Sequence, residues 1–482
     1  MDVARLGADL TSVPTSTLQR GTPLVHYGLT SDSTREAVSD TASGVVAILV
    51  CHGMGQQVRY ETISSIAEAI RTEATELGGT SAPVQVHLSY DKGAFLARAE
   101  LRWSDKAKVD HAVHVYEAYW APLTEGEVTY RDTILFLLSA AWNGLQWSKL
   151  FRLSSFERWM FDGRKRMQIG RATFAGIIGV LVFLALQVAL IAFVLLTLAQ
   201  QYRTLLAMPL PAAGSKDFVL VLLSWLGPLF PGFEQLLRPE SLGAWLKDAA
   251  CLLLWIAAIA EAFFARYFII QYVGDVAAYI SPYKDSKFDE IRREIQNIGL
   301  NVGKTIYGFG APQATVPHYR TVVVVGHSLG SVLAYDTLNA LINLDNVSEK
   351  TDRRDVVART RALITFGSPL DKTAFIFRMQ ARTATEWVRE QLAASIQPLI
   401  VSYEDYRPPA FEWINIWSSM DIISGELNYY DDPERTPNVP PCVQNKPDPE
   451  ARTFLKAHVQ YWKNHLLRQE LYRVVSGTAQ GG

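Results

Sequence analysis

Cysteine is scarce in this sequence. Its three cysteines, Cys51, Cys251 and Cys442, are odd in number, far apart and outside any CxxC spacing. A disulfide framework or a cysteine-based zinc site needs paired or closely spaced cysteines, so neither is expected. Reduced thiols are the state that this pattern predicts.

Excess charge of either sign is lacking as well. The 46 lysines and arginines nearly balance the 48 aspartates and glutamates, and the net charge is −2. A chain this close to neutral has no overall attraction to nucleic acid, so no nucleic-acid partner is expected.

The first residues also lack the basic segment and apolar core of a signal peptide. Residues 1–43 are rich in Ser, Thr, Gly and Asp without periodicity, and a flexible leader is predicted there.

Apolar residues are abundant but unevenly distributed. They make up 49% of the chain, and many of them lie between residues 172 and 273. Residues 172–199 carry no charge, and this length is enough to cross a bilayer. A weaker segment at residues 249–270 contains Glu261 and Arg266, which we expect to pair with each other or to face water. Two membrane-spanning helices are therefore predicted, with the lipid bilayer as a partner.

The sequence around these two segments predicts how the chain meets the membrane. Residues 218–230 are too short to span a bilayer and suit a re-entrant or interfacial segment. The basic run at residues 161–171 precedes the first span, which places that side in the cytoplasm by the positive-inside rule. Two spans return the chain to the side that it left. We therefore assign residues 161–280 to a membrane-anchoring helical insertion.

The residues that flank the insertion predict an α/β domain in two halves, residues 44–160 and 281–482. Apolar runs of strand length occur at residues 45–51, 322–325, 361–366 and 413–417. Apolar residues at helical spacing occur at residues 58–76, 288–306 and 331–342. Strands that alternate with helices are typical of a mostly parallel sheet.

One stretch has the pattern of a catalytic turn. Residues 326–330 read GHSLG, with four valines before them and a helical pattern after them. In so sharp a strand-to-helix turn, side chains at Gly326 and Gly330 would collide with the strand and the helix. Ser328 at the apex would present its hydroxyl as a nucleophile. The alternative is an ordinary glycine–serine turn between a strand and a helix.

A second glycine-containing loop follows the first predicted strand. Residues 52–55 read HGMG, and Gly53 and Gly55 allow backbone N–H groups to turn toward a site. Acyl transfer needs such donors for the oxyanion of its tetrahedral intermediate. The N–H groups of Met54 and Leu329 are the predicted donors. The histidine of this loop is expected to brace it rather than to transfer protons.

A serine nucleophile also needs a base and an acid, which follow it in the order Ser, acid, His in enzymes with this turn. Asp421 follows the last apolar strand, and Asp371, after the strand before it, is the alternative acid. The alternative role for Asp421 is a turn or helix-capping aspartate. His458 and His465 lie in a predicted helix over residues 454–466. We favour His458 as the base, because a catalytic histidine usually lies at a loop or helix edge.

These motifs together resemble the α/β-hydrolase superfamily, in particular membrane-anchored serine hydrolases of the lipase and esterase type. The resemblance is carried by VCHGMGQ at residues 50–56, GHSLGS at 326–331, TFGSPL at 365–370 and AHVQYW at 457–462. The run GHSLGSVLAYD is also similar to the catalytic turn of DDHD-type intracellular phospholipases. The resemblance implies an α/β-hydrolase fold and hydrolysis of carboxylic esters without a metal or other cofactor.

The sequence thus predicts a membrane-bound hydrolase with a cytoplasm-facing domain and a triad of Ser328, His458 and Asp421. A site held at a bilayer meets lipids at high local concentration, so acyl esters of lipids are the expected substrates. The alternative is a membrane scaffold or regulator that keeps the fold without catalysis. A scaffold would not need the glycines, the histidine and the acid together, which argues against that alternative.

Overall fold

The computed structural model of the chain describes nine segments and five single residues. These are residues 44–54, 58–91, 94–124, 286–310, 319–371, 410–421, 423–427, 440–453 and 456–477, with the single residues 185, 279, 373, 430 and 438. The predicted leader lies outside them. The predicted membrane segments at residues 172–199, 218–230 and 249–270 also lie outside them, apart from residue 185. Within the described residues, no helix is long and apolar enough to cross a bilayer.

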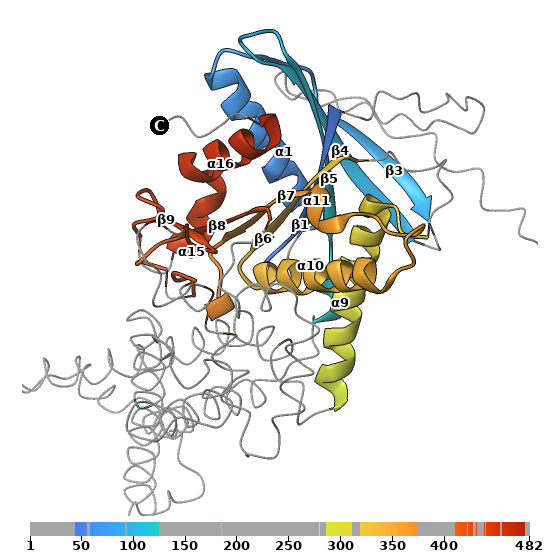
Figure 1. Ribbon diagram of the computed structural model, residues 1–482. Coiled ribbons are helices and arrows are strands. Elements are labelled where there is room, and N and C mark those ends of the chain that lie inside the picture. The colour runs from blue at the N-terminus through green and yellow to red at the C-terminus, as the bar shows by residue number, and fades with distance from the viewer. Residues whose placement is uncertain are drawn as a thin grey trace, which may run out of the picture.

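A single nine-stranded sheet forms the centre of the described structure (Figure 1). From one edge to the other its strands are β2 (Thr80–Ser81), β4 (Ala94–Ser104), β5 (Asp110–Ala118), β1 (Val45–Cys51), β6 (Thr321–His327), β7 (Thr360–Phe366), β8 (Glu412–Trp417) and β9 (Gln444–Pro447), and β3 (Gln85–Asp91) pairs with β4. The strands from β5 to β9 are parallel, whereas β2, β3 and β5 pair with β4 in antiparallel fashion. The prediction of a mostly parallel sheet is confirmed.

The central strands are rich in apolar and β-branched residues, and both of their faces are covered. In β6, Val322 and Val324 pack into one hydrophobic cluster, and Val323 and Val325 pack into another on the opposite face. All four side chains are fully buried. Continuous valine runs are what a strand buried on both faces requires.

Helices cover both faces of the sheet. On one face lie α9 (Ser286–Tyr307) and α10 (Leu329–Val347), which pack against each other, and on the other lie α1 (Glu61–Glu76) and α16 (His465–Ser476) (Figure 1). The remaining described helices are short: η2 (Ala121–Leu123), α11 (Val356–Arg359), α15 (Ala457–Gln460) and η6 (Tyr461–Lys463). Each long helix buries an apolar face at the spacing seen in the sequence.

The C-terminal helix predicted over residues 454–466 is wrong in its extent. The chain forms α15 and η6, leaves helical geometry at Asn464 and then begins α16. Asn464 has extended backbone angles, and its side-chain amide donates a hydrogen bond of 2.8 Å to Asp448 Oδ2. This buried polar contact competes with helix continuation, so His465 starts a new helix instead of lying deep in an old one.

The register of the sheet brings several loops together at the carboxyl ends of the strands. The last residues of the central strands are neighbours: Cys51 pairs with Gly326, His327 with Phe366, and Phe366 with Ile416. In open α/β sheets, ligands bind outside the carboxyl ends of the strands. The predicted site residues follow β1, β6, β7, β8 and β9, and so they all belong to the carboxyl ends of these strands.

Candidate active site

Ser328 lies at the turn between β6 and α10 in a conformation that is rare for a residue with a side chain. Its φ is 54° and its ψ is −131°. The backbone around it is held by three hydrogen bonds: Ser328 N–H donates to Phe366 O at 3.0 Å, Ser331 N–H to Ser328 O at 2.9 Å, and Ser331 Oγ to Gly326 O at 2.9 Å. Such strain persists only where the surroundings enforce it, and it is common at catalytic turns.

The glycines around Ser328 are needed because backbone approaches them closely. A Cβ on Gly326 would lie 2.5 Å from Ser331 Cα, and a Cβ on Gly330 would overlap the carbonyl oxygens at the end of β1. A Cβ on Gly53 would lie 2.8 Å from Ser328 Cβ. The collisions expected at Gly326 and Gly330 are therefore confirmed. The loop after β1 and the start of α10 lie directly against each other, with the serine beside both.

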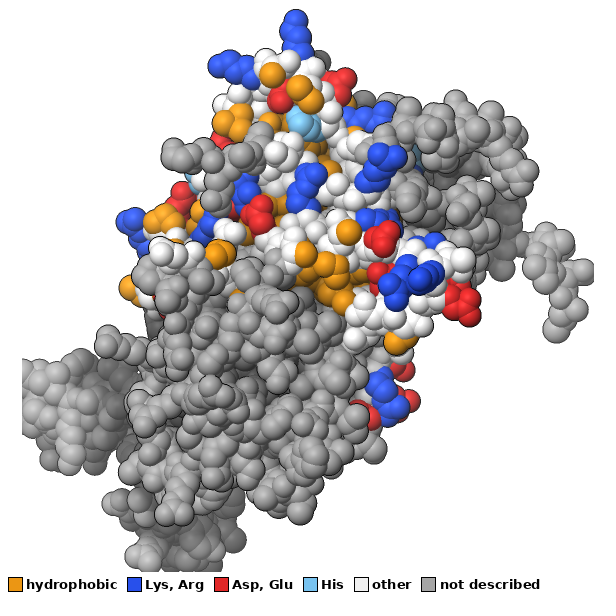
Figure 2. All heavy atoms as spheres, viewed as in Figure 1, with side chains coloured by type: hydrophobic (Ala, Val, Ile, Leu, Met, Phe, Trp, Pro, Cys, Tyr) orange, Lys and Arg blue, Asp and Glu red, His pale blue; other side chains and the backbone are white. Residues whose placement is uncertain are grey.

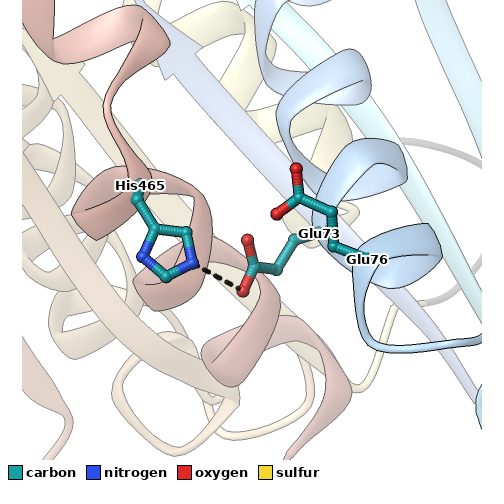
Figure 3. Close-up of side chains that lie close together, drawn as sticks. All are labelled: Glu73, Glu76 and His465. Atoms are coloured by element: carbon teal, nitrogen blue, oxygen red, sulfur yellow. Dashed lines mark ion pairs between the residues drawn. The ribbon is translucent and has the colours of Figure 1, made fainter.

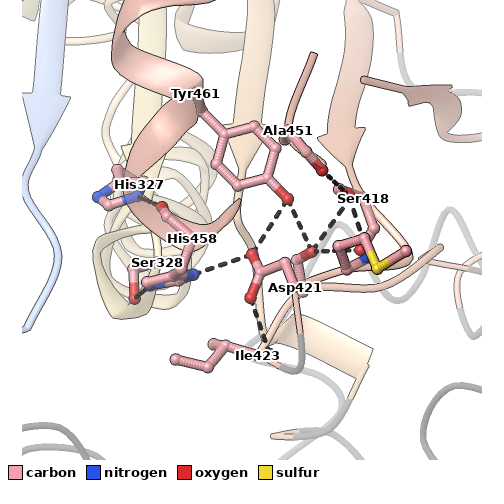
Figure 4. A network of polar contacts seen from close by, with 10 residues as sticks. His327, Ser328, Ser418, Asp421, Ile423, Ala451, His458 and Tyr461 are labelled. Carbon is pink, nitrogen blue, oxygen red and sulfur yellow. Dashed lines mark hydrogen bonds and ion pairs between the residues drawn. The ribbon is translucent and has the colours of Figure 1, made fainter. Parts of the chain in front are cut away.

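Ser328, His458 and Asp421 form a continuous chain of hydrogen bonds (Figure 4). Ser328 Oγ lies 2.8 Å from His458 Nε2, and His458 Nδ1 lies 2.9 Å from Asp421 Oδ2. His458 is in α15, and Asp421 is in the loop that follows β8. All three residues are buried. A serine, a base and an orienting acid in this order can activate the serine hydroxyl.

The carboxylate of Asp421 accepts more than the hydrogen bond from the histidine. Ile423 N–H donates to Oδ1 at 2.9 Å, and the Tyr461 hydroxyl donates to Oδ2 at 3.0 Å. Burial acts to raise the pKa of Asp421, but its hydrogen bonds and the charge of His458 outweigh burial and hold this pKa well below its ordinary value. The carboxylate is therefore ionised and can stabilise a positive imidazolium.

His327, the residue before the serine, fixes the backbone of His458. Its Nε2 donates to His458 O at 3.0 Å, and the two rings have centroids 5.1 Å apart. Burial, together with the nearby His458, lowers the pKa of His327 to about 3. His327 is thus neutral, with its proton on Nε2, and supports the segment that carries His458.

His52 braces the loop after β1, as expected. Its Nε2 accepts a hydrogen bond of 3.0 Å from Trp120 N–H, and its Nδ1 donates to Gly53 O at 2.8 Å. The ring stacks on Trp120, with centroids 5.0 Å apart. Burial lowers the pKa of His52 to about 4, so the ring is neutral and both nitrogens are engaged.

The two predicted oxyanion donors are close to the serine in different ways. Leu329 follows Ser328 in the sequence, and Met54 belongs to the loop after β1, which lies against Ser328. Leu329 is the first residue of the 19-residue helix α10, and N–H groups at such a position have no acceptor within the helix. Met54 is buried and follows Gly53, the residue whose backbone lies against Ser328. Gly55 lies outside the described residues. The positive end of α10 adds to a potential that favours negative charge beside Ser328.

The two alternatives that the sequence left open lie elsewhere. Asp371 is buried after β7, but it is Asp421 whose carboxylate contacts His458. His465 faces α1, where its Nε2 lies 3.6 Å from Glu73 Oε1. The geometry therefore assigns the acid position to Asp421 and the base position to His458.

One group in the described part of the chain has spacing that would suit a metal ion (Figure 3). Ligand atoms of Glu73, Glu76 and His465 lie within 4.8 Å of one another between α1 and α16. Arg468 Nη1, however, already donates to Glu76 Oε1 at 2.9 Å. The guanidinium of Arg468 thus already balances the charge of one of the two carboxylates. We interpret the group as an ion cluster that joins the two helices.

Tyr461 is a site residue that reasoning from the sequence missed. It follows His458 by three residues, and residues three apart on a helical segment face the same side. That spacing is the signal that could have identified it.

No family model, curated protein or solved structure matches this chain, so the interpretation of the site depends on its geometry.

Proposed function

We propose that this chain is a serine hydrolase that cleaves carboxylic esters through an acyl-enzyme. The observation that carries the proposal is the chain of hydrogen bonds from Ser328 Oγ through His458 to Asp421, with distances of 2.8 and 2.9 Å. A serine in a strained strand-to-helix turn, joined to a buried histidine and an ionised acid, has the arrangement that nucleophilic catalysis needs.

In this mechanism, Ser328 Oγ attacks the carbonyl carbon of the ester while His458 Nε2 takes its proton. Asp421 Oδ2 holds the imidazole through Nδ1 and stabilises its positive charge. The tetrahedral intermediate collapses when His458 returns the proton to the leaving alkoxide, which departs as an alcohol. Water then attacks the acyl-enzyme with His458 as its base, and Ser328 is regenerated with release of a carboxylic acid.

The oxyanion of each tetrahedral intermediate would be stabilised beside the start of α10. We assign the two donors to the N–H groups of Leu329 and Met54, from the start of α10 and the loop after β1. The positive end of α10 favours the same charge. A neutral His52 keeps the loop in place without adding a competing proton donor.

The finer features of the proposal concern fold and location. We assign the chain to the α/β-hydrolase fold, with residues 161–280 as a transmembrane insertion between two halves of one cytoplasm-facing domain. The apolar segments and the preceding basic run support the insertion. Lipid acyl esters are then the substrates that the site meets most often. Alkaline extraction of native membranes tests this location, and release of the chain into the supernatant would contradict it.

Charges of both signs occur together on one face of the described domain. On the face in Figure 2, basic and acidic side chains are interspersed over the described part of the chain. This distribution agrees with the net charge of −2. A nucleic-acid-binding protein would instead gather Lys and Arg on one face.

Labelling with a fluorophosphonate probe tests the proposed chemistry. The probe reacts with serines that a base activates, so the native chain should be labelled, and Ser328→Ala and His458→Ala should not. Ser348→Ala, at the other end of α10, serves as the control and should be labelled like the native chain. Absence of labelling in a folded native chain would refute the proposal and favour the non-catalytic scaffold.

A further inference from the structure

Tyr461 contacts the same carboxylate oxygen as the catalytic histidine (Figure 4). Its hydroxyl lies 3.0 Å from Asp421 Oδ2, and His458 Nδ1 lies 2.9 Å from that atom. An ionised carboxylate only accepts hydrogen bonds, so the hydroxyl of Tyr461 must be the donor. Ser424 Oγ, 3.0 Å from the same hydroxyl, therefore donates to Tyr461.

The ring of Tyr461 is held firmly enough to fix this hydroxyl. The side chain is fully buried and packs beside Phe366, with ring centroids 6.3 Å apart. Gly367 has a φ of 59°, and a Cβ there would lie 3.2 Å from Tyr461 Cε2 and 3.3 Å from His458 Cε1. The tyrosine and the histidine therefore pack against one glycine at the end of β7. The Tyr461 side chain therefore has few other conformations, and little conformational entropy is lost when its hydroxyl bonds Asp421.

We infer that Tyr461 is a positioning residue, whose hydroxyl holds the Asp421 carboxylate with Oδ2 toward His458. The inference rests on the proposed function and deepens it. Ile423 N–H fixes the other oxygen, Oδ1, at 2.9 Å, so the two donors together prevent rotation of the carboxylate. Tyr461 acts through Asp421 and His458 and has no part in bond formation with substrate.

The charged and titratable groups around the pair define what a pH measurement reports. Asp421 faces His458 from the loop after β8, and His327 faces His458 from the end of β6. Tyr461 faces Asp421 from η6. Asp448 also acts on Tyr461 through its charge. Loss of the Tyr461 hydroxyl leaves the negative charge of Asp421 less satisfied. The carboxylate then attracts the imidazolium form of His458 more strongly, and protonated His458 cannot act as a base.

The test compares Tyr461→Phe with the native chain in hydrolysis of p-nitrophenyl butyrate. Because one hydrogen bond to the acid is lost, kcat should fall about tenfold with KM unchanged. The acid limb of the pH profile of kcat/KM should move to higher pH. Tyr307→Phe is the matched control, since it removes an equally buried hydroxyl that bonds Thr360 Oγ1 at 2.7 Å. That variant should keep the native kcat and pH profile.

The outcomes separate this inference from the proposed function. A native kcat and pH profile in Tyr461→Phe, or an equal kcat loss in Tyr307→Phe, would overturn the positioning role while labelling at Ser328 stands. A native chain that neither hydrolyses the ester nor takes up the fluorophosphonate would overturn both. Should Tyr461→Phe fail to fold, Ser424→Ala provides the decision. It removes a hydroxyl that bonds both Tyr461 and Asp421, so kcat should fall in the same direction, and a native kcat would refute the role of these donors in holding the carboxylate.

Discussion

At the scale of single residues, the ionisation of Asp421 depends on hydrogen bonds that oppose its burial. A carboxyl group taken out of water tends to become neutral, which would deprive His458 of its negative partner. Donors at both carboxylate oxygens reverse that tendency. The acid is thus negative because of its donors and in spite of its location.

Replacement of Asp421 by Asn should therefore be severe. The amide has no charge to stabilise the imidazolium, and it favours the wrong tautomer of His458. We expect kcat for ester hydrolysis to fall by roughly 10⁴-fold while the fold is kept. The kinetics of p-nitrophenyl butyrate hydrolysis, with circular dichroism to check folding, provide the measurement.

Asp371→Asn is the control for this substitution, because Asp371 is a buried aspartate that follows the neighbouring strand β7. It should keep most of the native rate. A larger loss of kcat in Asp371→Asn than in Asp421→Asn would show that the acid was assigned to the wrong strand end.

The sequence allowed most of these residues to be proposed, for reasons that differ. Ser328 is marked by its glycines and by a strand and a helix on either side, all local features. Asp421 and His458 are marked by their order along the chain, by the strand before Asp421 and by the place of His458 near a helix edge. Tyr461 was missed although it follows His458 by three residues, because its role depends on a contact with a residue 40 positions away. Such contacts are set by tertiary packing, which the local pattern does not contain.

At the scale of elements, the position of the serine depends on how closely α10 packs against β1. Gly330 lies at the start of α10, against the carbonyl oxygens of Cys51 and His52. These oxygens belong to backbone and cannot rotate away. The only remedy for a side chain at residue 330 is to move the helix, and with it the turn that carries Ser328.

Gly330→Ala should therefore destabilise the domain and abolish labelling by the fluorophosphonate probe. Overpacking of this kind typically costs about 1–3 kcal/mol of unfolding free energy. Denaturant unfolding together with probe labelling would measure both effects.

Gly303→Ala is the matched control in α9, where a Cβ would lie 2.7 Å from Leu341 Cδ1. A leucine side chain can rotate, and alanine favours a helix by about 1 kcal/mol over glycine. This variant should keep its stability and its labelling. Equal damage from both substitutions would refute the role assigned to the contact between α10 and β1.

The elements themselves were predictable where their hydrophobic pattern is strong, as in β6 and α10. The break at Asn464 was not predictable, because the apolar spacing continues through it. It results from the hydrogen bond between Asn464 and Asp448, two residues brought together by the loop after β9.

At the scale of the whole molecule, three histidines in the described part of the chain are buried in neutral form. Burial lowers the pKa of His52 and His114 to about 4 and that of His327 to about 3. The ordinary value, expected in the unfolded chain, is about 6.5. Between these values the unfolded chain binds more protons than the folded one. Stability that is present above about pH 6.5 is therefore lost as the pH falls toward 4.

His114→Gln should weaken this pH dependence without touching the candidate active site. His114 lies on β5, bonded to Tyr319, and it faces Glu100 and Arg98 from β4. One histidine accounts for at most about 1.4 kcal/mol of unfolding free energy per pH unit. Guanidinium unfolding of both chains at pH 7.5 and 5 should show a smaller loss in the variant. Equal losses in the two chains would contradict a neutral, buried His114.

The mostly parallel sheet was predictable from the alternation of apolar strands with helices. Its order was not, because strand order depends on pairings between distant parts of the chain. The antiparallel pairing of β4 with β5 and the position of β1 between β5 and β6 are examples. Helical and strand periodicity indicate which faces of an element are buried. They carry no information on which strand pairs with which in the sheet.

The pairing of β1 with β6 has a consequence for synthesis. Val46 pairs with Thr321, so most of the polypeptide is made between the two partners. Until β6 leaves the ribosome, β1 has β5 as its neighbour on one side and an open edge of valine, isoleucine and leucine on the other. Such an edge pairs readily with other chains. The nascent protein therefore passes through a vulnerable period whose length is set by the rate of elongation, and slower translation before residue 321 would increase aggregation.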